Sequence, residues 1–260
     1  AELLIGRNDN MISDKATYSI GTEDFADDNA FMEYGLRLQA NFSENFYLGL
    51  MGIYFDADGI DDVPATATWT KYAAGTDLDL QQYGAYLSYS FTPAIALRGY
   101  YYWQDLDDGW LGAATEDSPQ TWSVLLDLKQ DLLKFTSLWV QYIEQDNTWV
   151  GPRASTQYAA IFTPGEQYPV TGDGTNKTFM VNAYQQWGES KWSSFLQYIT
   201  TDWDQSTVDD TDQYTIGIGY QYTPQIKFWL AYNYIDYGDT TKGDYSGDES
   251  VILFRTAIDF

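Results

Sequence analysis

The sequence predicts an all-β fold, in which about 12 antiparallel strands, and at most about 16, follow one another up and down around a barrel. Three observations predict it. Apolar and polar residues alternate along most of the chain, the alternating segments are unusually long, and short and long connections follow each other in strict alternation. No linker or change of composition divides the chain, so residues 1–260 are expected to form a single domain.

The alternation is clearest over residues 213–222. Tyr214, Ile216 and Ile218 share one face of this segment, and Thr215 lies on the other. Strands are expected at residues 1–8, 30–42, 45–56, 79–91, 94–105, 119–130, 134–146, 176–187, 191–202, 211–222, 225–237 and 249–260. Most of these segments have the ~9–11 residues or more that a tilted strand needs to cross a bilayer, whereas ordinary strands average ~5–6.

The connections between these segments fall into two length classes. The tight ones lie near residues 43–44, 92–93, 132, 188–189 and 223–224, and the long ones span residues 9–29, 57–78, 106–118, 147–175, 203–210 and 238–248. With an even number of strands, the tight turns and both chain ends fall on one side and the long loops on the other. This layout is typical of a transmembrane barrel with short periplasmic turns and long extracellular loops.

Aromatic residues make up 18% of the chain, and many lie near the ends of the expected strands. Examples are Trp103, Trp110, Trp122, Trp187, Trp192, Trp203, Tyr234 and Tyr237. Girdles of Trp and Tyr at the two membrane interfaces would explain these positions. The alternative is that the same residues form the core or the sugar-binding surface of a soluble secreted β-protein.

Composition excludes several function classes. With 13 basic and 38 acidic residues the net charge is −25, which argues against a nucleic-acid partner. The chain contains neither His nor Cys, so Ser-His-Asp triads, Cys-His pairs and zinc sites built on those residues are excluded. Carboxylate pairs suited to glycoside hydrolysis are abundant, but nothing singles one out. We therefore assign no catalytic residue and do not expect an enzyme.

Most acidic residues fall in or beside the six long loops, where solvated loop tips are the simplest interpretation. One run has a weak divalent-cation pattern, with Asp56, Asp58, Asp61 and Asp62 around Gly59. It lacks the terminal Glu of an EF-hand loop. No cofactor is expected apart from Ca²⁺ at these acidic loops.

Charged residues inside the expected strands are predicted to face the lumen, because a charge facing lipid at the midplane costs ~2–4 kcal/mol. With aromatic residues of the same face, they give a predicted pore lining of Arg7, Glu33, Arg37, Arg98, Tyr100, Tyr102, Asp127, Lys129, Lys227, Trp229, Arg255 and Asp259. Two interpretations stay open. The charges either pair with one another and fill a plugged lumen, or they line an open pore and set its ion preference.

The last strand alternates Ile252, Phe254, Thr256 and Ile258 and ends on Phe260, an ending common among bacterial outer-membrane barrels. Over its whole length the chain resembles a bacterial outer-membrane porin. The segments 37–46 (RLQANFSENF) and 4–8 (LIGRN) are similar to the barrel of S-layer-homology-domain porins of diderm Firmicutes. In that family a peptidoglycan-binding domain and a stalk precede the barrel, and this sequence is expected to be the barrel alone.

The resemblance implies passive diffusion of small hydrophilic solutes or ions across the bacterial outer membrane. Its expected partners are outer-membrane lipid, the solutes and, as the oligomer considered, a homotrimer. Two alternatives remain: a non-conducting barrel that serves as an outer-membrane anchor or surface protein, and a soluble secreted β-protein that binds or cleaves polysaccharide. Bilayer conductance separates the first two hypotheses, and detergent dependence with heat-modifiable gel mobility separates both from the third.

Overall fold

The computed structural model describes residues 1–8, 31–56, 79–107, 115–149, 173–204, 209–238 and 247–258. Its elements are β1 (Glu2–Asn8), β2 (Phe31–Ser43), β3 (Phe46–Asp56), β4 (Leu80–Thr92), β5 (Ile95–Leu106), β6 (Gln120–Leu128), α1 (Gln130–Leu133), β7 (Ser137–Asp146), β8 (Thr175–Gln186), β9 (Trp192–Asp202), β10 (Thr211–Thr223), β11 (Ile226–Asp236) and β12 (Asp248–Ile258).

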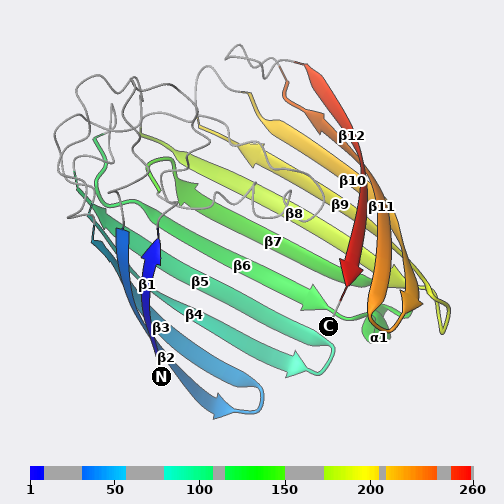
Figure 1. Cartoon of the computed structure of the whole chain (residues 1–260), viewed down its shortest axis with the longest axis horizontal. Coiled ribbons are helices and arrows are strands. Elements are labelled where there is room, and N and C mark those ends of the chain that lie inside the picture. Colours follow the sequence, from blue (N-terminus) through cyan, green and yellow to red (C-terminus); the bar gives the residue numbers. More distant parts are fainter. Residues whose placement is uncertain are drawn as a thin grey trace.

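The strands form one sheet in which each strand pairs antiparallel with the next, from β1 to β12. The predicted all-β, up-and-down architecture with twelve strands is therefore confirmed. Figure 1 shows the sheet curled into a barrel wall, with β1 and β12 as its two edges and both chain ends on the side of the tight turns. In the described ranges no ladder joins β12 to β1, and the same ranges contain no helix long and apolar enough to cross a membrane.

Three of the tight turns share one construction. The strand before each turn ends in Ser43, Thr92 or Thr223, and the register shifts by one residue just before that position. The hydroxyl oxygen accepts a backbone N–H two residues later in each turn, at 3.2 Å for Ser43 and Thr92 and 3.3 Å for Thr223. Such local hydrogen bonds favour a turn over a continued strand.

The connection between β6 and β7 differs from the prediction, which extended the sixth strand to residue 130. The strand ends at Leu128, and the short helix α1 follows. Lys129 is the N-cap of α1 and donates its backbone N–H to the carbonyl oxygen of Ala94 at 2.9 Å. Lys134 closes the helix with a left-handed backbone, φ 70°. Lys129 is therefore outside the strand in which it was expected to line a pore.

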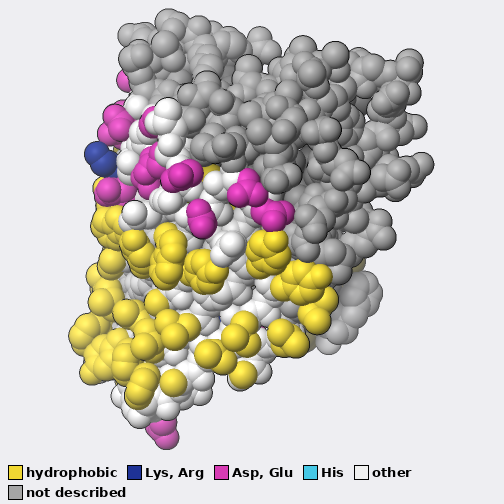
Figure 2. Space-filling model, turned by 90° about the vertical axis from the view of Figure 1, so that its left-hand side faces the viewer, with side chains coloured by type: hydrophobic (Ala, Val, Ile, Leu, Met, Phe, Trp, Pro, Cys, Tyr) yellow, Lys and Arg dark blue, Asp and Glu magenta, His cyan; other side chains and the backbone are white. Residues whose placement is uncertain are grey.

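The two faces of the sheet differ in polarity as the alternation predicts. In β10, Ile216 and Ile218 are 58% and 47% exposed, while Thr215 between Tyr214 and Ile216 is fully buried. Each pair of neighbouring strands carries large apolar side chains on the exposed outer face. The buried polar side chains lie on the inner face. Figure 2 shows the outer side chains as a broad hydrophobic band, with acidic side chains gathered between the band and the loop end.

The strands tilt steeply along the ladder. A line drawn from each residue to its Cα partner on the next strand starts at Glu2 in β1 and reaches Asn176 at the start of β8. They connect Tyr184 of β8 to Leu253 of β12. A tilt of about 40° in a twelve-stranded barrel corresponds to a total stagger of about 14 residues, given spacings of ~4.8 Å between strands and ~3.3 Å between residues. If β12 pairs with β1 at this stagger, Leu3 of β1 lies opposite Ile258 of β12.

We expect the bilayer to close this seam, because unpaired backbone groups cannot face lipid. The double variant Leu3→Cys/Ile258→Cys should then form a disulfide in the membrane-inserted protein, read as a shift in non-reducing gel mobility. The chain has no cysteine of its own, so the background is clean. Leu3→Cys/Ala257→Cys places the second thiol on the opposite face and serves as the control. Equal cross-linking of both pairs would contradict the proposed register.

Candidate functional site

The inner wall is shaped by large rings that lie over glycines of the neighbouring strand. A Cβ atom added to Gly49 would lie 2.0 Å from the Tyr86 ring, and one added to Gly217 would lie 2.3 Å from the Phe195 ring. The same holds for Gly84 under Tyr102 and for Gly219 under Trp229. Only a residue without a side chain leaves space for these rings to lie flat against the wall.

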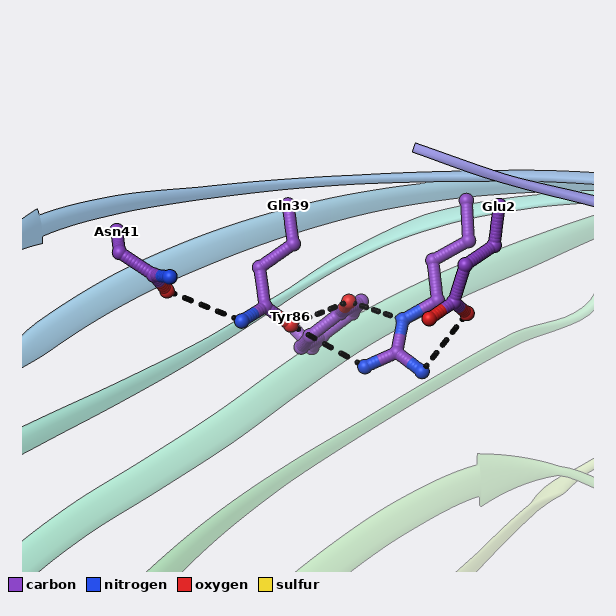
Figure 3. Close-up of polar contacts among 5 residues, drawn as sticks. Glu2, Gln39, Asn41 and Tyr86 are labelled. Carbon is purple, nitrogen blue, oxygen red and sulfur yellow. Dashed lines mark hydrogen bonds and ion pairs between the residues drawn. The ribbon is translucent and has the colours of Figure 1, made fainter.

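One cluster on this wall surrounds Arg37 of β2 (Figure 3). The Arg37 Nε donates to the Tyr86 hydroxyl at 2.5 Å, and its Cζ lies 5.0 Å from the centre of that ring. A second guanidinium nitrogen donates to Gln39 at 3.2 Å, and the third lies 3.5 Å from the Glu2 carboxylate. Gln39 in turn donates to Asn41 at 3.0 Å. The cation is thus oriented by a tyrosine and an amide, with one distant and exposed carboxylate.

A second cluster surrounds Lys227 of β11. Its ammonium lies 3.8 Å from the centre of the Trp229 ring and 5.5 Å from that of Tyr184, and it donates to the Tyr184 hydroxyl at 3.5 Å. Phe195 packs edge-on against Trp229, with 5.5 Å between ring centres. In the described residues no carboxylate lies within ion-pair distance of Lys227. The rings therefore stabilise the cation by cation–π contact without neutralising it.

The remaining inward cations have different surroundings. Arg98 of β5 forms an ion pair with Asp127 of β6 at 3.2 Å, so its charge is compensated locally. Arg255 of β12 is exposed and lies opposite Trp229 in the ladder. Tyr100 and Tyr102 follow Arg98 on the same face, in phase with the buried Gln104. Of these four inward cations, Arg37 and Lys227 are bordered by aromatic rings, and Arg37 and Arg98 each form an ion pair with a carboxylate.

Polar side chains form a row across β8 to β11. Asn182, Gln197, Thr215 and Asn233 are Cα partners from strand to strand. Gln197 donates to Asn182 at 2.8 Å, and Thr215 donates to Asn233 at 2.6 Å. Three buried atoms of the row have no hydrogen-bond partner among the described residues: Asn182 Nδ2, Gln197 Oε1 and Asn233 Nδ2. None of these four residues belongs to the predicted pore lining, although Asn233 and Gln197 share the inward phase of Thr215.

Most of the predicted pore-lining residues lie on the inner face, namely Arg37, Arg98, Tyr100, Tyr102, Asp127, Lys227, Trp229 and Arg255. Glu2 of β1 pairs with the inward Arg37. Arg7 pairs with Met32, and its position alternates with that of Glu2, so it falls on the opposite face of β1. Glu33 pairs with Gly6, in phase with Arg37. The side chains of Arg7 and Glu33, and the whole of Asp259, lie outside the described residues. The pore-lining role of all these residues stays a prediction.

The predicted cation motif falls largely outside the residues that the structure describes. Asp58, Asp61 and Asp62 lie outside the described residues, as does the side chain of Asp56 at the end of β3. In the part of the chain that the structure describes, no three carboxylates come together in a way that could hold a metal ion. The calcium site stays a prediction from sequence.

Of the predicted girdle residues, some lie exposed on the outer face, as a girdle requires, and others are buried. Trp103, Trp187 and Trp192 are 42–56% exposed on the outer face. Trp203 and Tyr237 are buried, at 2% and 6% exposed. Trp203 follows the inward Thr201 by two residues, so its side chain turns inward and donates to Thr211 at 2.9 Å.

At the loop end, acidic side chains tie the connections together. Asp173, before β8, accepts hydrogen bonds from the Thr115 hydroxyl at 2.6 Å and from the backbone N–H groups of Thr115 and Glu116 at 2.9 and 3.0 Å. These hydrogen bonds lower the pKa of Asp173. Burial and the nearby charges of Asp146 and Asp173 raise the pKa of Glu116.

No family model and no curated protein matches this chain. Among solved structures, it is similar to the NanC porin, with 10% identity, a TM-score of 0.42 and coverage of 88% of this chain and 94% of that one. It is also similar to the CymD monoaromatic hydrocarbon channel, with 10% identity, a TM-score of 0.43 and coverage of 89% and 75%. OccD3 (OpdP) of Pseudomonas aeruginosa has 12% identity, a TM-score of 0.43 and coverage of 90% and 66%.

The ring-over-glycine packing leads to a stability prediction. In Gly84→Ala the new methyl group would lie 1.9 Å from the Tyr102 ring and 2.5 Å from the Tyr101 carbonyl oxygen. Overpacking of this kind costs ~1–3 kcal/mol, so the midpoint of urea unfolding in detergent should fall. Gly52→Ala is the matched control on the adjacent strand, because its nearest contact would be 3.4 Å away. Equal midpoints for the two variants would contradict the packing described.

The loop-end contact leads to a pH prediction. Because the pKa of Asp173 is lowered on folding, its hydrogen bonds stabilise the fold above the ordinary pKa of 3.8. This stabilisation is lost as the pH falls through the folded value. Hydrogen exchange of the backbone amides of Thr115 and Glu116, corrected for intrinsic rates, should therefore become faster as the pH falls through that pKa. In Asp173→Asn the amides should be less protected even at neutral pH. Unchanged protection in that variant would show that other groups close this connection.

Proposed function

We propose that this protein is an outer-membrane channel through which small hydrophilic solutes and ions diffuse passively, with a preference for anions. The observation that carries the proposal is the contrast between the two faces of one twelve-stranded sheet. The outer face is apolar, and the inner face carries polar and basic side chains among buried apolar ones such as Ile143, Met180 and Ile199. An apolar band with aromatic borders suits lipid, and a polar interior suits water and solutes.

The size of the barrel is compatible with this role. Twelve strands at a spacing of ~4.8 Å and a tilt of ~40° give a backbone cylinder about 24 Å across. Inward rings such as Tyr86, Tyr102 and Trp229 narrow this cylinder, and the glycines beneath them keep the rings close to the wall. The remaining lumen would admit ions and small solutes.

The ion preference follows from where the charges lie. Among the side chains that the structure describes, the cations Arg37, Arg98, Lys227 and Arg255 lie inward near the tight turns, and the acids Glu2 and Asp127 lie in the same zone. At ~0.15 M salt the Debye length is ~8 Å, so carboxylates at the loop end act weakly on that zone. Charges on a narrow wall of low dielectric are screened less. The lumen should therefore favour anions although the whole chain carries a charge of −25.

The test is the reversal potential in a planar bilayer under a KCl gradient. The wild type should prefer chloride, and Arg37→Gln/Arg255→Gln should shift the reversal potential toward that of potassium. Asp58→Asn/Asp209→Asn removes the same number of charges from the loop end and should shift it less, in the opposite direction.

A larger shift for the loop pair would place the selective zone at the loop end instead. Absence of conductance in protein that is inserted and heat-modifiable on gels would favour the alternative function, a non-conducting anchor or surface barrel.

A further inference from the structure

The inward side chains of the sheet differ in how much surface they leave accessible. In β9 all of them, from Ser193 to Thr201, are buried. In β2, by contrast, the inward Arg37 and Gln39 are exposed. A dissolved ion can contact only atoms that are accessible. It therefore meets the two sides of the inner wall differently.

The position of a strand relative to the edges of the sheet does not explain this difference. β3 and β10 are each separated from an edge strand by one strand. Their inward residues Ile53 and Thr215 lie at similar distances from the tight turns of the two strands. Ile53 is only half-buried, whereas Thr215 is fully buried. The greater accessibility is therefore a property of the wall around β2 and β3.

The accessible side of the wall continues on β12. Leu253 points inward like its Cα partner Ala231, and it is half-buried. Arg255 lies two residues further along the same face and is exposed. Closing the barrel makes β12, β1, β2 and β3 neighbours. We call this side of the wall the seam strip and define it by Glu2, Arg37, Gln39, Ile53, Leu253 and Arg255.

Arg37 is a charge of the seam strip that the structure holds in place (Figure 3). Its Nε donates to the Tyr86 hydroxyl, and Gln39 accepts from both the guanidinium and that hydroxyl, at 3.2 and 3.3 Å. The Tyr86 ring lies flat over Gly49. Glu2 lies 3.5 Å from the guanidinium, but the two side chains are 46% and 73% exposed, so the ion pair is weak. The charge of Arg37 is therefore oriented and only partly compensated.

We propose that ions cross the barrel along the seam strip and that Arg37 makes this path prefer anions, a proposal that rests on the channel function proposed above. The path is displaced to one side because the inward side chains of β9 are buried and offer an ion no contact. A charge at the edge of the path acts on ions within the ~8 Å Debye length of ~0.15 M salt. Arg98 lies on β5, outside the strip, and is paired with Asp127, so it should act less.

Cysteine labelling compares the two sides of the wall. Ile53→Cys and Thr215→Cys are the matched pair, and the chain has no cysteine of its own. Both variants are first required to show heat-modifiable mobility. A charged methanethiosulfonate reagent needs an accessible thiol, so it should modify Ile53→Cys at least about tenfold faster than Thr215→Cys, measured by mass spectrometry on protein in liposomes. In planar bilayers it should lower the conductance of Ile53→Cys. Equal rates for the two variants would overturn the proposal.

Single-charge variants test the role of Arg37. Under a KCl gradient, Arg37→Gln should shift the reversal potential toward that of potassium. Arg98→Gln removes the same charge outside the seam strip and should shift it at most about half as far, because screening weakens a more distant charge. An equal or larger shift for Arg98→Gln would show that the ions are not confined to the strip, and the proposal would be wrong.

Failure of the channel function gives a different result from failure of the path. Wild-type protein that is inserted and heat-modifiable but shows no conductance would contradict the channel function, and the path with it. A conducting protein in which modification of Ile53→Cys leaves the conductance unchanged would keep the channel function and contradict the path alone.

Discussion

The continuous antiparallel ladder is the constraint on which the rest of the structure depends. Successive side chains of a strand point to opposite faces, so a slip of one residue would exchange the two faces of that strand. In β10 such a slip would bury Ile216 and place Thr215 outside, and it would pull Phe195 off Gly217. Because each strand pairs with both neighbours, the error would also spread along the sheet. The outer apolar face and the inner polar wall are therefore two consequences of one register.

Alternation made most of the fold predictable from the sequence, and it failed where both faces are apolar. In β3, Leu50 is 53% exposed on the outer face while Met51 is half-buried on the inner one, so their neighbourhood carries no polarity signal. The register resolves the faces, because Met51 lies opposite Gly84. Trp203 differs from the prediction for another reason: position at a strand end does not determine which face a side chain is on, whereas the two-residue spacing of Trp203 from the buried Thr201 indicates the inner face.

The candidate site was less predictable, because the surroundings of a charge depend on neighbours across strands. Period-2 phase gave the inward side of Arg98 and Lys227, but it contains no information about their partners. Arg98 meets Asp127, which follows it by 29 positions, and becomes compensated. Lys227 meets Tyr184 from a strand three places away in the sheet. Likewise, which side-chain atoms of Asn233 and Gln197 lack a hydrogen bond among the described residues depends on the side chains of the neighbouring strands. The sequence of one strand contains no information about them.

The acid excess also has a structural role that composition alone does not suggest. Asp146 accepts from the Gln120 backbone N–H at 2.7 Å and from the Thr175 hydroxyl at 2.9 Å, so one carboxylate joins the ends of β6, β7 and β8. Carboxylates suit this role because they only accept hydrogen bonds, and the backbone N–H groups at strand ends need acceptors. Lysine or arginine could not replace them there. The charges of Asp146 and Asp173 at the loop end therefore serve backbone pairing, while the inner wall carries cations such as Arg37 and Lys227, so the two regions differ in the sign of their charge.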